Sequence, residues 1–131
     1  MESPDNPKLR VLMVEDEEDT ASLLKFLLER ANYQVVHAKD GRQAQELVAT
    51  IPPPDMVLLD VMLPFLSGLQ VLTIIRKCEG WKKVPIVMLT ADGSEHDIKR
   101  ALESGANDYM IKPFNPRELT SRLKRFVGQA A

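Results

Sequence analysis

The stretch PDMVLLDVMLP, residues 54–64, decides the fold. Within it, four apolar residues at 56–59 lead directly into Asp60, and Pro64 follows four positions later. An uninterrupted apolar run of this length is typical of a strand that is buried on both faces of a parallel sheet. Because a carboxylate is costly to remove from water, the place of Asp60 at the end of this strand needs a reason from the rest of the chain.

Length and composition predict one ordinary globular domain. The chain has 131 residues, of which 44% are hydrophobic, and a net charge of −2 from 17 basic and 19 acidic side chains. This balance gives no reason to expect that the chain as a whole binds nucleic acid or an anionic membrane. We expect the domain to cover residues 9–128, with a flexible N-terminal segment at 1–8 and a short C-terminal tail at 129–131.

Three features of the sequence predict a cytoplasmic protein. No apolar run approaches the length of a membrane span. The first ten residues, MESPDNPKLR, are polar and therefore unlike a secretory signal peptide. Cys78 is the only cysteine, so the chain has no disulfide framework, which fits a reducing compartment.

Segments typical of strands and of helices alternate five times along the chain. Apolar runs suited to buried strands occur at 11–14, 35–36, 56–59, 86–89 and 109–111. Each run is followed by a segment whose apolar residues recur at helical spacing, as Leu24, Leu27, Leu28 and Ala31 do. Such alternation predicts an α/β fold in which a doubly wound, five-stranded parallel sheet carries five helices on its two faces.

Polar residues follow four of the five predicted strands. In strand order they are Glu15 and Asp16, then Asp60, then Thr90, and finally Lys112. The second strand ends in His37 and adds no obvious chemical group. Because the carboxyl ends of parallel strands meet at one edge of a sheet, we expect the three carboxylates, the hydroxyl and the ammonium to share a crevice there.

This combination of groups indicates a site for a metal ion and a phosphoryl group. Three carboxylates at one edge repel one another unless a cation lies among them. Ligands that are all oxygens suit Mg²⁺, which keeps several waters and accepts few carboxylates. A metal beside a lysine and a hydroxyl can bind a phosphoryl group. At any single position the simpler explanation is a solvated strand end, and only the set of five favours a site.

Four motifs carry a resemblance to a known family. They are VEDEED at 14–19, LLDVMLPFLSG at 58–68, VMLTA at 87–91 and YMIKPF at 109–114. Over about residues 10–127 the chain resembles the receiver domain of two-component response regulators, which implies a flavodoxin-like strand order of 2-1-3-4-5. The stretch RALESGANDYMIKPFNPREL, residues 100–119, resembles in particular the receivers of winged-helix transcription factors.

The resemblance implies a role for each residue of the site. Asp60 would accept a phosphoryl group from the phosphohistidine of a histidine kinase or phosphotransfer protein. Glu15, Asp16 and Asp60, with the backbone carbonyl of Met62, would hold Mg²⁺ as the cofactor, and Lys112 would pair with the phosphoryl oxygens. A carboxylate is a weak nucleophile towards an anionic phosphoryl group, so positive charge has to offset both. The chain would catalyse only its own phosphotransfer and slow autodephosphorylation, and would not otherwise be an enzyme.

The resemblance also implies a conformational switch. The hydroxyl of Thr90 would move to bond the phosphoryl group, and the aromatic ring of Tyr109 would turn inward into the space that Thr90 leaves. The peptide bond between Lys112 and Pro113 would be cis. The face formed by the predicted helix around 98–105, the last strand and the last helix would then change for partner binding.

Four charged residues on that face suggest a homodimer. By resemblance, Arg100 would pair with Glu118 of a second copy and Asp108 with Arg122, in a phosphorylation-dependent two-fold dimer where each pair occurs twice. The alternative is that these are solvated surface charges, since each such pair is worth little by itself. The sequence leaves both interpretations open.

Three other classes of protein share parts of the pattern. A haloacid dehalogenase phosphatase needs a second Asp two residues after its nucleophile, where this chain has Met62. A flavodoxin needs a phosphate loop rich in Ser, Thr and Gly after the first strand, and the sequence EDEEDT at 15–20 would instead repel a phosphate. A receiver-like interaction module that signals without phosphorylation stays open, although every phosphotransfer position is filled.

Overall fold

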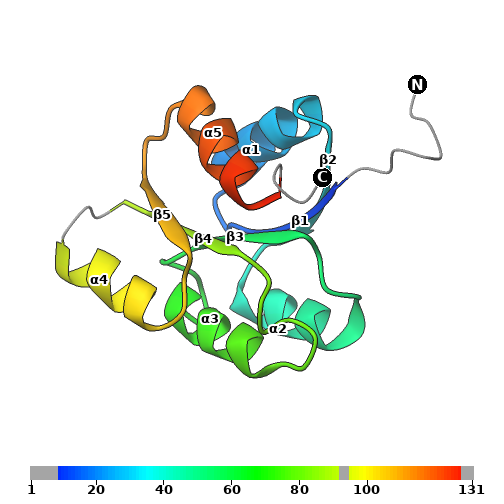
Figure 1. The fold of residues 1–131 in the computed structure, drawn as a ribbon, viewed down its shortest axis with the longest axis vertical. Coiled ribbons are helices and arrows are strands. Elements are labelled where there is room, and N and C mark those ends of the chain that lie inside the picture. Colours follow the sequence, from blue (N-terminus) through cyan, green and yellow to red (C-terminus); the bar gives the residue numbers. More distant parts are fainter. Residues whose placement is uncertain (1–8, 92–94, 128–131) are drawn as a thin grey trace.

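The computed structural model describes residues 9–91 and 95–127. Five strands form one parallel sheet in the order β2-β1-β3-β4-β5, which confirms the predicted fold class and strand order (Figure 1). The predicted flexible N-terminal segment at 1–8 and the predicted C-terminal tail at 129–131 lie outside the described residues, as does residue 128. The strands are β1 (Leu9–Val14), β2 (Tyr33–Ala38), β3 (Met56–Asp60), β4 (Ile86–Thr90) and β5 (Asp108–Ile111).

Helices cover both faces of the sheet. In Figure 1, α1 and α5 lie on one face, and α2, α3 and α4 lie on the other. Among the described residues, no helix is both long and apolar enough to cross a membrane. The helices are α1 (Glu18–Arg30), α2 (Gly41–Thr50), α3 (Gly68–Lys77), α4 (Glu95–Glu103) and α5 (Pro116–Val127).

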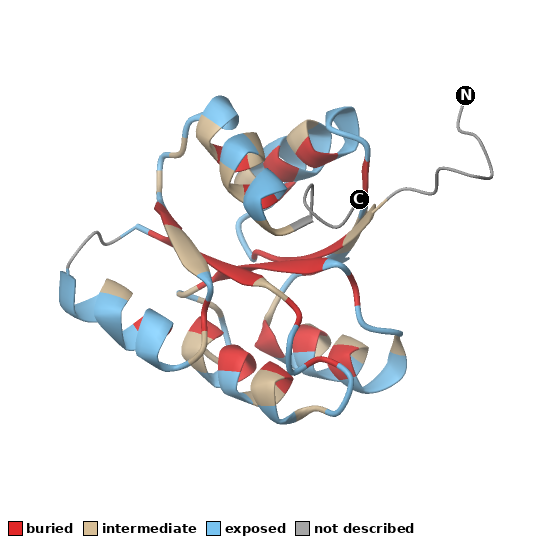
Figure 2. Cartoon of the chain, viewed as in Figure 1, coloured by how far each residue is buried: buried red, intermediate tan, exposed pale blue. Residues whose placement is uncertain are grey.

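The sheet separates two hydrophobic cores, because successive side chains of a strand point to opposite faces. In β1, Leu12 and Val14 join the core beneath α2, α3 and α4, whereas Val11 and Met13 join the core beneath α1 and α5. Strands β3 and β4 are buried along their whole length, as the red centre of the sheet in Figure 2 shows. Burial on both faces explains why these two strands read as continuous apolar runs.

Three helices begin at side chains that cap them. The carboxylate of Glu17 accepts hydrogen bonds from two backbone N–H groups at the start of α1. The carboxylate of Asp40 accepts the N–H of Gln43 in α2. Ser67 and Gln70 form a reciprocal capping box at the start of α3. These caps place the beginnings of α1 and α3 directly after the loops that follow β1 and β3.

Two side chains hold the connection between α3 and β4. Trp81 is only 2% exposed and packs in the core beneath α3. The guanidinium of Arg76, at the end of α3, donates to the backbone oxygens of Gly105 at 2.7 Å, Val84 at 2.8 Å and Lys82 at 3.0 Å. This one side chain therefore ties α3 to the segments that lead into both β4 and β5.

Candidate functional site

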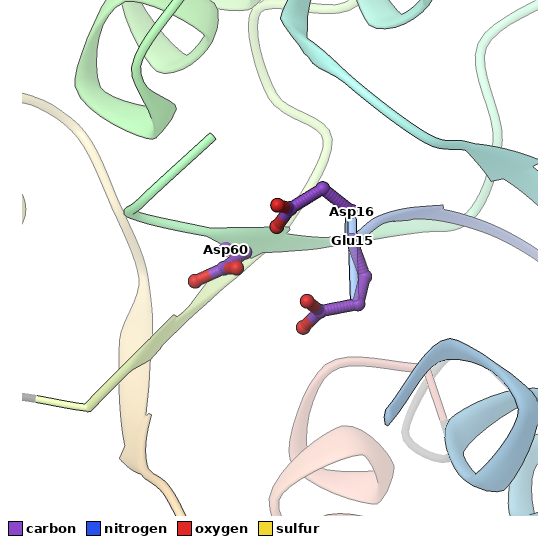
Figure 3. Close-up of side chains that lie close together, drawn as sticks. All are labelled: Glu15, Asp16 and Asp60. Carbon is purple, nitrogen blue, oxygen red and sulfur yellow. The ribbon is translucent and has the colours of Figure 1, made fainter. Parts of the chain in front are cut away.

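Four strands deliver polar side chains to one edge of the sheet. Glu15 and Asp16 directly follow β1, Asp60 is the last residue of β3, Thr90 is the last residue of β4, and Lys112 directly follows β5. Figure 3 shows the first two at the end of one strand and Asp60 at the end of its neighbour. The structure thus places all five residues on the edge where the sequence predicted them.

The three carboxylates form a compact acidic cluster. Each of Glu15, Asp16 and Asp60 offers an oxygen atom, and these atoms lie within 4.8 Å of one another. Glu15 is fully buried and Asp60 is only 4% exposed, whereas Asp16 is exposed to solvent. The cluster therefore has a buried base and one carboxylate at its open side.

Lys112 supplies positive charge to the two buried carboxylates. Its Nζ lies 2.8 Å from Oε1 of Glu15 and 3.2 Å from Oδ2 of Asp60. Its backbone N–H donates to the carbonyl of Thr90 at 2.7 Å, and its peptide bond to Pro113 is cis. The lysine is thereby held between the ends of β1, β3 and β4, with its ammonium facing the cluster.

The balance of charge in the cluster is visible in the pKa values. Burial raises the pKa of Asp60 to about 6, and the negative charge of Glu15 adds to this rise, although Lys112 and the N–H of Met62 oppose it. Burial also works to lower the pKa of Lys112, but its contacts with Glu15 and Asp60 outweigh this and raise the pKa above the usual value. The ammonium of Lys112 therefore does not bring the pKa of Asp60 back to its usual value.

The donor set fits a hard divalent cation. The three side chains offer only oxygen atoms, and a cation would offset the charge of Glu15, which together with burial raises the pKa of Asp60. An exposed carboxylate beside two buried ones leaves one side of a bound ion open to water. Glu15, Asp16 and Asp60 could therefore hold a metal ion that retains several waters.

Two contacts hold the loop between Asp60 and α3. The N–H of Gly68 donates to the carbonyl of Val61 at 2.8 Å, so the start of α3 lies directly behind the end of β3. Phe65 has a left-handed φ of 71°, is 64% exposed, and lies under the guanidinium of Arg42, whose carbon is 4.0 Å from the ring centre. The hydrogen bond joins the two ends of the loop, and the cation–π contact holds Phe65 within it.

A cavity lies between β4, α4 and β5, next to the acidic cluster. It has a volume of about 210 Å³, and its lining includes Thr90, Tyr109, Met88 and Ala101. Tyr109 is half-buried, and the guanidinium carbon of Arg122 lies 5.7 Å from the centre of its ring. The two residues expected to act as a switch therefore border one cavity.

Three charged residues of the face formed by α4, β5 and α5 are paired within the chain: Asp108, Glu118 and Arg122. Arg122 contacts Oδ1 of Asp108 at 2.8 Å and Oε2 of Glu118 at 3.2 Å. Arg100 lies on α4 and lines the cavity described above. The sequence analysis expected Asp108 and Arg122 to pair between two copies, and the single chain shows that they can also pair with each other.

Comparison with known proteins identifies the family. A sequence model of the response regulator receiver domain matches residues 11–124. The chain belongs to this family. The receiver domain of a Pseudomonas aeruginosa sensor histidine kinase, solved with magnesium coordinated in its active-site cleft, is 34% identical, with a TM-score of 0.85 and coverage of 92% of this chain and 98% of that one. CheY4 of Vibrio cholerae is 30% identical, with a TM-score of 0.86 and coverage of 92% and 99%.

The curated relatives are longer transcriptional regulatory proteins. PhoP of Bacillus subtilis, the alkaline phosphatase synthesis regulator, is 45% identical over 92% of this chain and 49% of its own length. PhoB of Escherichia coli, the phosphate regulon regulator, is 44% identical over 88% of this chain and 50% of its own length. The chain thus spans about half the length of the curated relatives that it matches.

One contact at the site was missed by sequence reasoning. His37, in β2, has its Nε2 2.8 Å from the backbone oxygen of Glu15. In the sequence, this histidine follows the short apolar run at 35–36 and has no partner residue at a spacing typical of metal ligands. The signal that could have found it is its position beside β1 in the sheet, since its register with β1 brings it next to the first acidic residue.

Proposed function

We propose that Asp60 accepts a phosphoryl group from the phosphohistidine of a histidine kinase or phosphotransfer protein, and that residues 9–128 form the receiver domain that does so. One observation carries this proposal. A buried carboxylate at a strand end has a lysine ammonium 3.2 Å away and two further carboxylates beside it. This arrangement provides a nucleophile, a partner for phosphoryl oxygens and a place for a cation.

The chemistry follows from the position of Asp60. One of its carboxylate oxygens forms the new bond to phosphorus as the bond from phosphorus to the donor imidazole nitrogen breaks, and the electron pair of that bond returns to the nitrogen. β3 is buried throughout and keeps the attacking oxygen in a fixed direction at the rim of the sheet. The ammonium of Lys112 is placed to bond a phosphoryl oxygen next to that carboxylate.

We propose that the acidic cluster holds Mg²⁺ through Glu15, Asp16 and Asp60, with the carbonyl of Met62 as a further ligand. The donor set, which consists of oxygen atoms alone, supports this choice, as does the negative charge of Glu15 beside Asp60. When bound, Mg²⁺ supplies positive charge that offsets the carboxylates and the incoming phosphoryl group. In the absence of a cation, the ammonium of Lys112 opposes the repulsion between Glu15 and Asp60.

Phosphorylation would act on the cavity behind the site. It adds about −1.5 to −2 charges at Asp60, a strong acceptor towards which the hydroxyl of Thr90 can move. Both Thr90 and Tyr109 border the 210 Å³ cavity, so a shift of the first leaves room for the ring of the second. The face formed by α4, β5 and α5 would change in response, as a bias between two states of one fold.

Acetyl phosphate with Mg²⁺ is expected to add one phosphoryl group to the chain, because a small donor needs no partner protein to reach the rim of the sheet. Intact-mass measurement would follow the addition, and hydroxylamine should remove the group, as it removes acyl phosphates. The Asp60→Asn variant should gain no phosphoryl group. Stoichiometric, hydroxylamine-sensitive labelling of that variant would contradict the assignment of Asp60.

Mg²⁺ is expected to stabilise the folded chain, since it binds only where the three carboxylates are together. At a concentration tenfold above the dissociation constant, the gain in free energy of unfolding should be about 1.4 kcal/mol. Because a proton on Asp60, whose pKa is raised to about 6, competes with the cation, binding should tighten as the pH rises through that value. The midpoint of thermal unfolding, followed against Mg²⁺ concentration at several pH values, measures both effects.

Two variants control the magnesium experiment. Asp16→Asn removes one carboxylate of the cluster and should weaken the response to Mg²⁺. Glu46→Gln removes an exposed carboxylate on α2, away from the cluster, and should leave the response unchanged. A wild-type midpoint that is the same at every Mg²⁺ concentration would rule out the proposed metal site.

We propose further that the phosphorylated chain forms a two-fold dimer through α4, β5 and α5. Arg100 would pair with Glu118 of the second copy, and Asp108 with Arg122. Since Arg122 already contacts Asp108 and Glu118 within one chain, dimerisation exchanges pairs that exist for pairs between copies. The exchange has a small net effect by itself, so the change of the face on phosphorylation has to decide whether the dimer forms.

Sedimentation with and without beryllofluoride, a phosphoryl mimic, tests the dimer. With the mimic and Mg²⁺ the chain should dimerise, and Arg122→Glu should prevent this without reducing phosphorylation of Asp60. Lys25→Glu reverses an exposed charge on α1 and should leave the dimer intact. A mimic-bound chain that stays monomeric at high concentration would exclude the symmetric dimer and point to a different partner for this face.

A further inference from the structure

The end of β2 is bonded to the acidic turn after β1. The imidazole Nε2 of His37 lies 2.8 Å from the backbone oxygen of Glu15. A carbonyl oxygen can only accept a hydrogen bond, so Nε2 carries the proton in this contact. The N–H of Glu15 in turn donates to the carbonyl of Ala38 at 3.1 Å. Both polar atoms of the Glu15 backbone are therefore engaged by two consecutive residues of β2.

The geometry of the sheet brings these groups together. In the parallel pairing of β1 with β2, Met13 lies opposite His37 and Val14 lies opposite Ala38. Glu15 is the first residue after the described ladder between these strands, at the point where the chain leaves the sheet. The side chain of His37 contacts Glu15, two residues beyond its ladder partner Met13, so the turn that carries the acidic pair is held from the neighbouring strand.

The bonded oxygen belongs to the peptide group that joins Glu15 to Asp16. Because the peptide group is held, the directions in which the side chains of Glu15 and Asp16 leave the backbone are restricted. The carboxylate of Glu15 is held separately, since Oε1 pairs with Lys112 at 2.8 Å and Oε2 accepts the N–H of Glu17 at 3.1 Å. Asp16 is exposed, and its carboxylate reaches the other two from the peptide group that His37 contacts.

We propose that His37 is a positioning residue for the metal site: its hydrogen bond to the peptide between Glu15 and Asp16 holds the acidic pair in the orientation that binds a divalent cation. The inference rests on the proposed function, because it assigns His37 a part in that same site. Groups that orient metal ligands without touching the metal typically change metal affinity by 10- to 100-fold when they are removed. A preorganised pair binds more tightly because less freedom is lost on binding.

Substitutions at position 37 test whether the hydrogen bond of His37, and not only the bulk of its side chain at the strand end, orients the acidic pair. His37→Leu keeps bulk but removes the donor, and His37→Asn keeps polarity but is too short to reach the carbonyl of Glu15. His37→Gln carries an N–H donor at a comparable reach. His96→Leu changes the other histidine of the chain, which is exposed on α4 and lies outside the site.

The experiment measures the dissociation constant of Mg²⁺ for the full chain and the backbone amide ¹⁵N shift of Asp16, which reports on the bonded peptide. His37→Leu and His37→Asn should each weaken Mg²⁺ binding about tenfold, the lower end of the range for such residues, because His37 is exposed to solvent. Both should shift the Asp16 resonance before any metal is added. His37→Gln should restore the affinity, and His96→Leu should change neither quantity.

The outcomes distinguish this inference from the proposed function on which it rests. If the wild type binds Mg²⁺ and His37→Leu and His37→Asn bind it equally well, the positioning role is wrong and the metal site stands. The same conclusion follows if His37→Gln weakens binding as much as His37→Leu, since a donor would then not be what matters. If the wild type does not bind Mg²⁺, both the metal site and the role of His37 fall.

Discussion

Without divalent cations and at neutral pH, the Asp60→Asn variant is expected to be more stable than the wild type, by up to about 3 kcal/mol in free energy of unfolding. The expected size comes from the raised pKa of Asp60, which is about 6 in the folded chain against a usual value of 3.8. Burial and the neighbouring charge of Glu15 make the ionised carboxylate unfavourable in the folded state. An amide in its place carries no charge and removes this cost.

The sign of the pH dependence follows from the direction of the shift. Between about pH 4 and about pH 6 the folded chain binds more protons at Asp60 than the unfolded chain does, so this group makes stability fall as the pH rises. The cost is complete above pH 6 and disappears below pH 4. The advantage of Asp60→Asn should therefore be largest at neutral pH and should shrink on acidification.

Urea unfolding of both proteins at a series of pH values measures this difference. Added Mg²⁺ should reduce it, since only the wild type keeps all three carboxylates to bind the cation. Glu46→Gln, at an exposed position on α2, should change stability by less than about 0.5 kcal/mol at any pH. If Asp60→Asn is no more stable than the wild type at neutral pH, the ionised carboxylate of Asp60 does not destabilise the folded chain.

Gly68→Ala is expected to destabilise the chain by about 3 kcal/mol or more. A Cβ at Gly68 would lie 2.2 Å from the backbone oxygen of Asp60 and 2.7 Å from Cα of Val61, and neither atom belongs to a flexible side chain. Helix propensity alone favours alanine over glycine by about 1 kcal/mol, so packing and propensity predict opposite signs here. We expect packing to dominate, because relief of the contact has to move the backbone of Asp60 and Val61.

Gly80→Ala provides the matched control for that substitution. Gly80 has a positive φ of 89°, but an added Cβ would meet only Cγ of Pro53, at 3.4 Å. The cost should be that of a left-handed alanine, about 1 kcal/mol. Chemical denaturation of the two variants separates a steric clash from a conformational penalty. Equal losses would indicate that the close approach of α3 to Asp60 does not matter.

The parts of the site that were predictable from sequence share a physical basis. Asp60 and Thr90 end strands that are buried on both faces, and such strands read as uninterrupted apolar runs with a sharp polar boundary. Parallel topology then forces these boundaries to one edge of the sheet, where Lys112 also arrives from β5. A local pattern and one topological rule were therefore sufficient to gather these side chains.

β2 was the least predictable strand, for a reason that its burial explains. The apolar run at 35–36 covers only part of Tyr33–Ala38, because β2 is at the edge of the sheet and its Gln34 and His37 are exposed. Its sequence therefore lacks the long apolar run of the central strands. The contact of His37 with Glu15 depends on the register between two strands, which no single stretch of sequence encodes.

Contacts between side chains and distant parts of the chain could not be predicted from the sequence either. Arg76 belongs to the last turn of α3 and reads as an ordinary solvated charge, yet its guanidinium binds carbonyls on two separate connections. Likewise, the pairing of Arg122 with Asp108 in one chain depends on how α5 packs beside β5. Such contacts become known only when the helices and strands are placed in three dimensions. The residues of the acidic cluster could be predicted without them.

The location of the phosphoryl group tests the central proposal most directly. After reaction with acetyl phosphate and Mg²⁺, borohydride reduces an acyl phosphate to the corresponding alcohol and so marks the residue that carried it. Peptide mass spectrometry should find this change at Asp60 and at no other carboxylate. Reduction at Glu15 or Asp16, or a phosphorylated chain in which Asp60 is unmodified, would contradict the assignment of Asp60 as the phosphoacceptor.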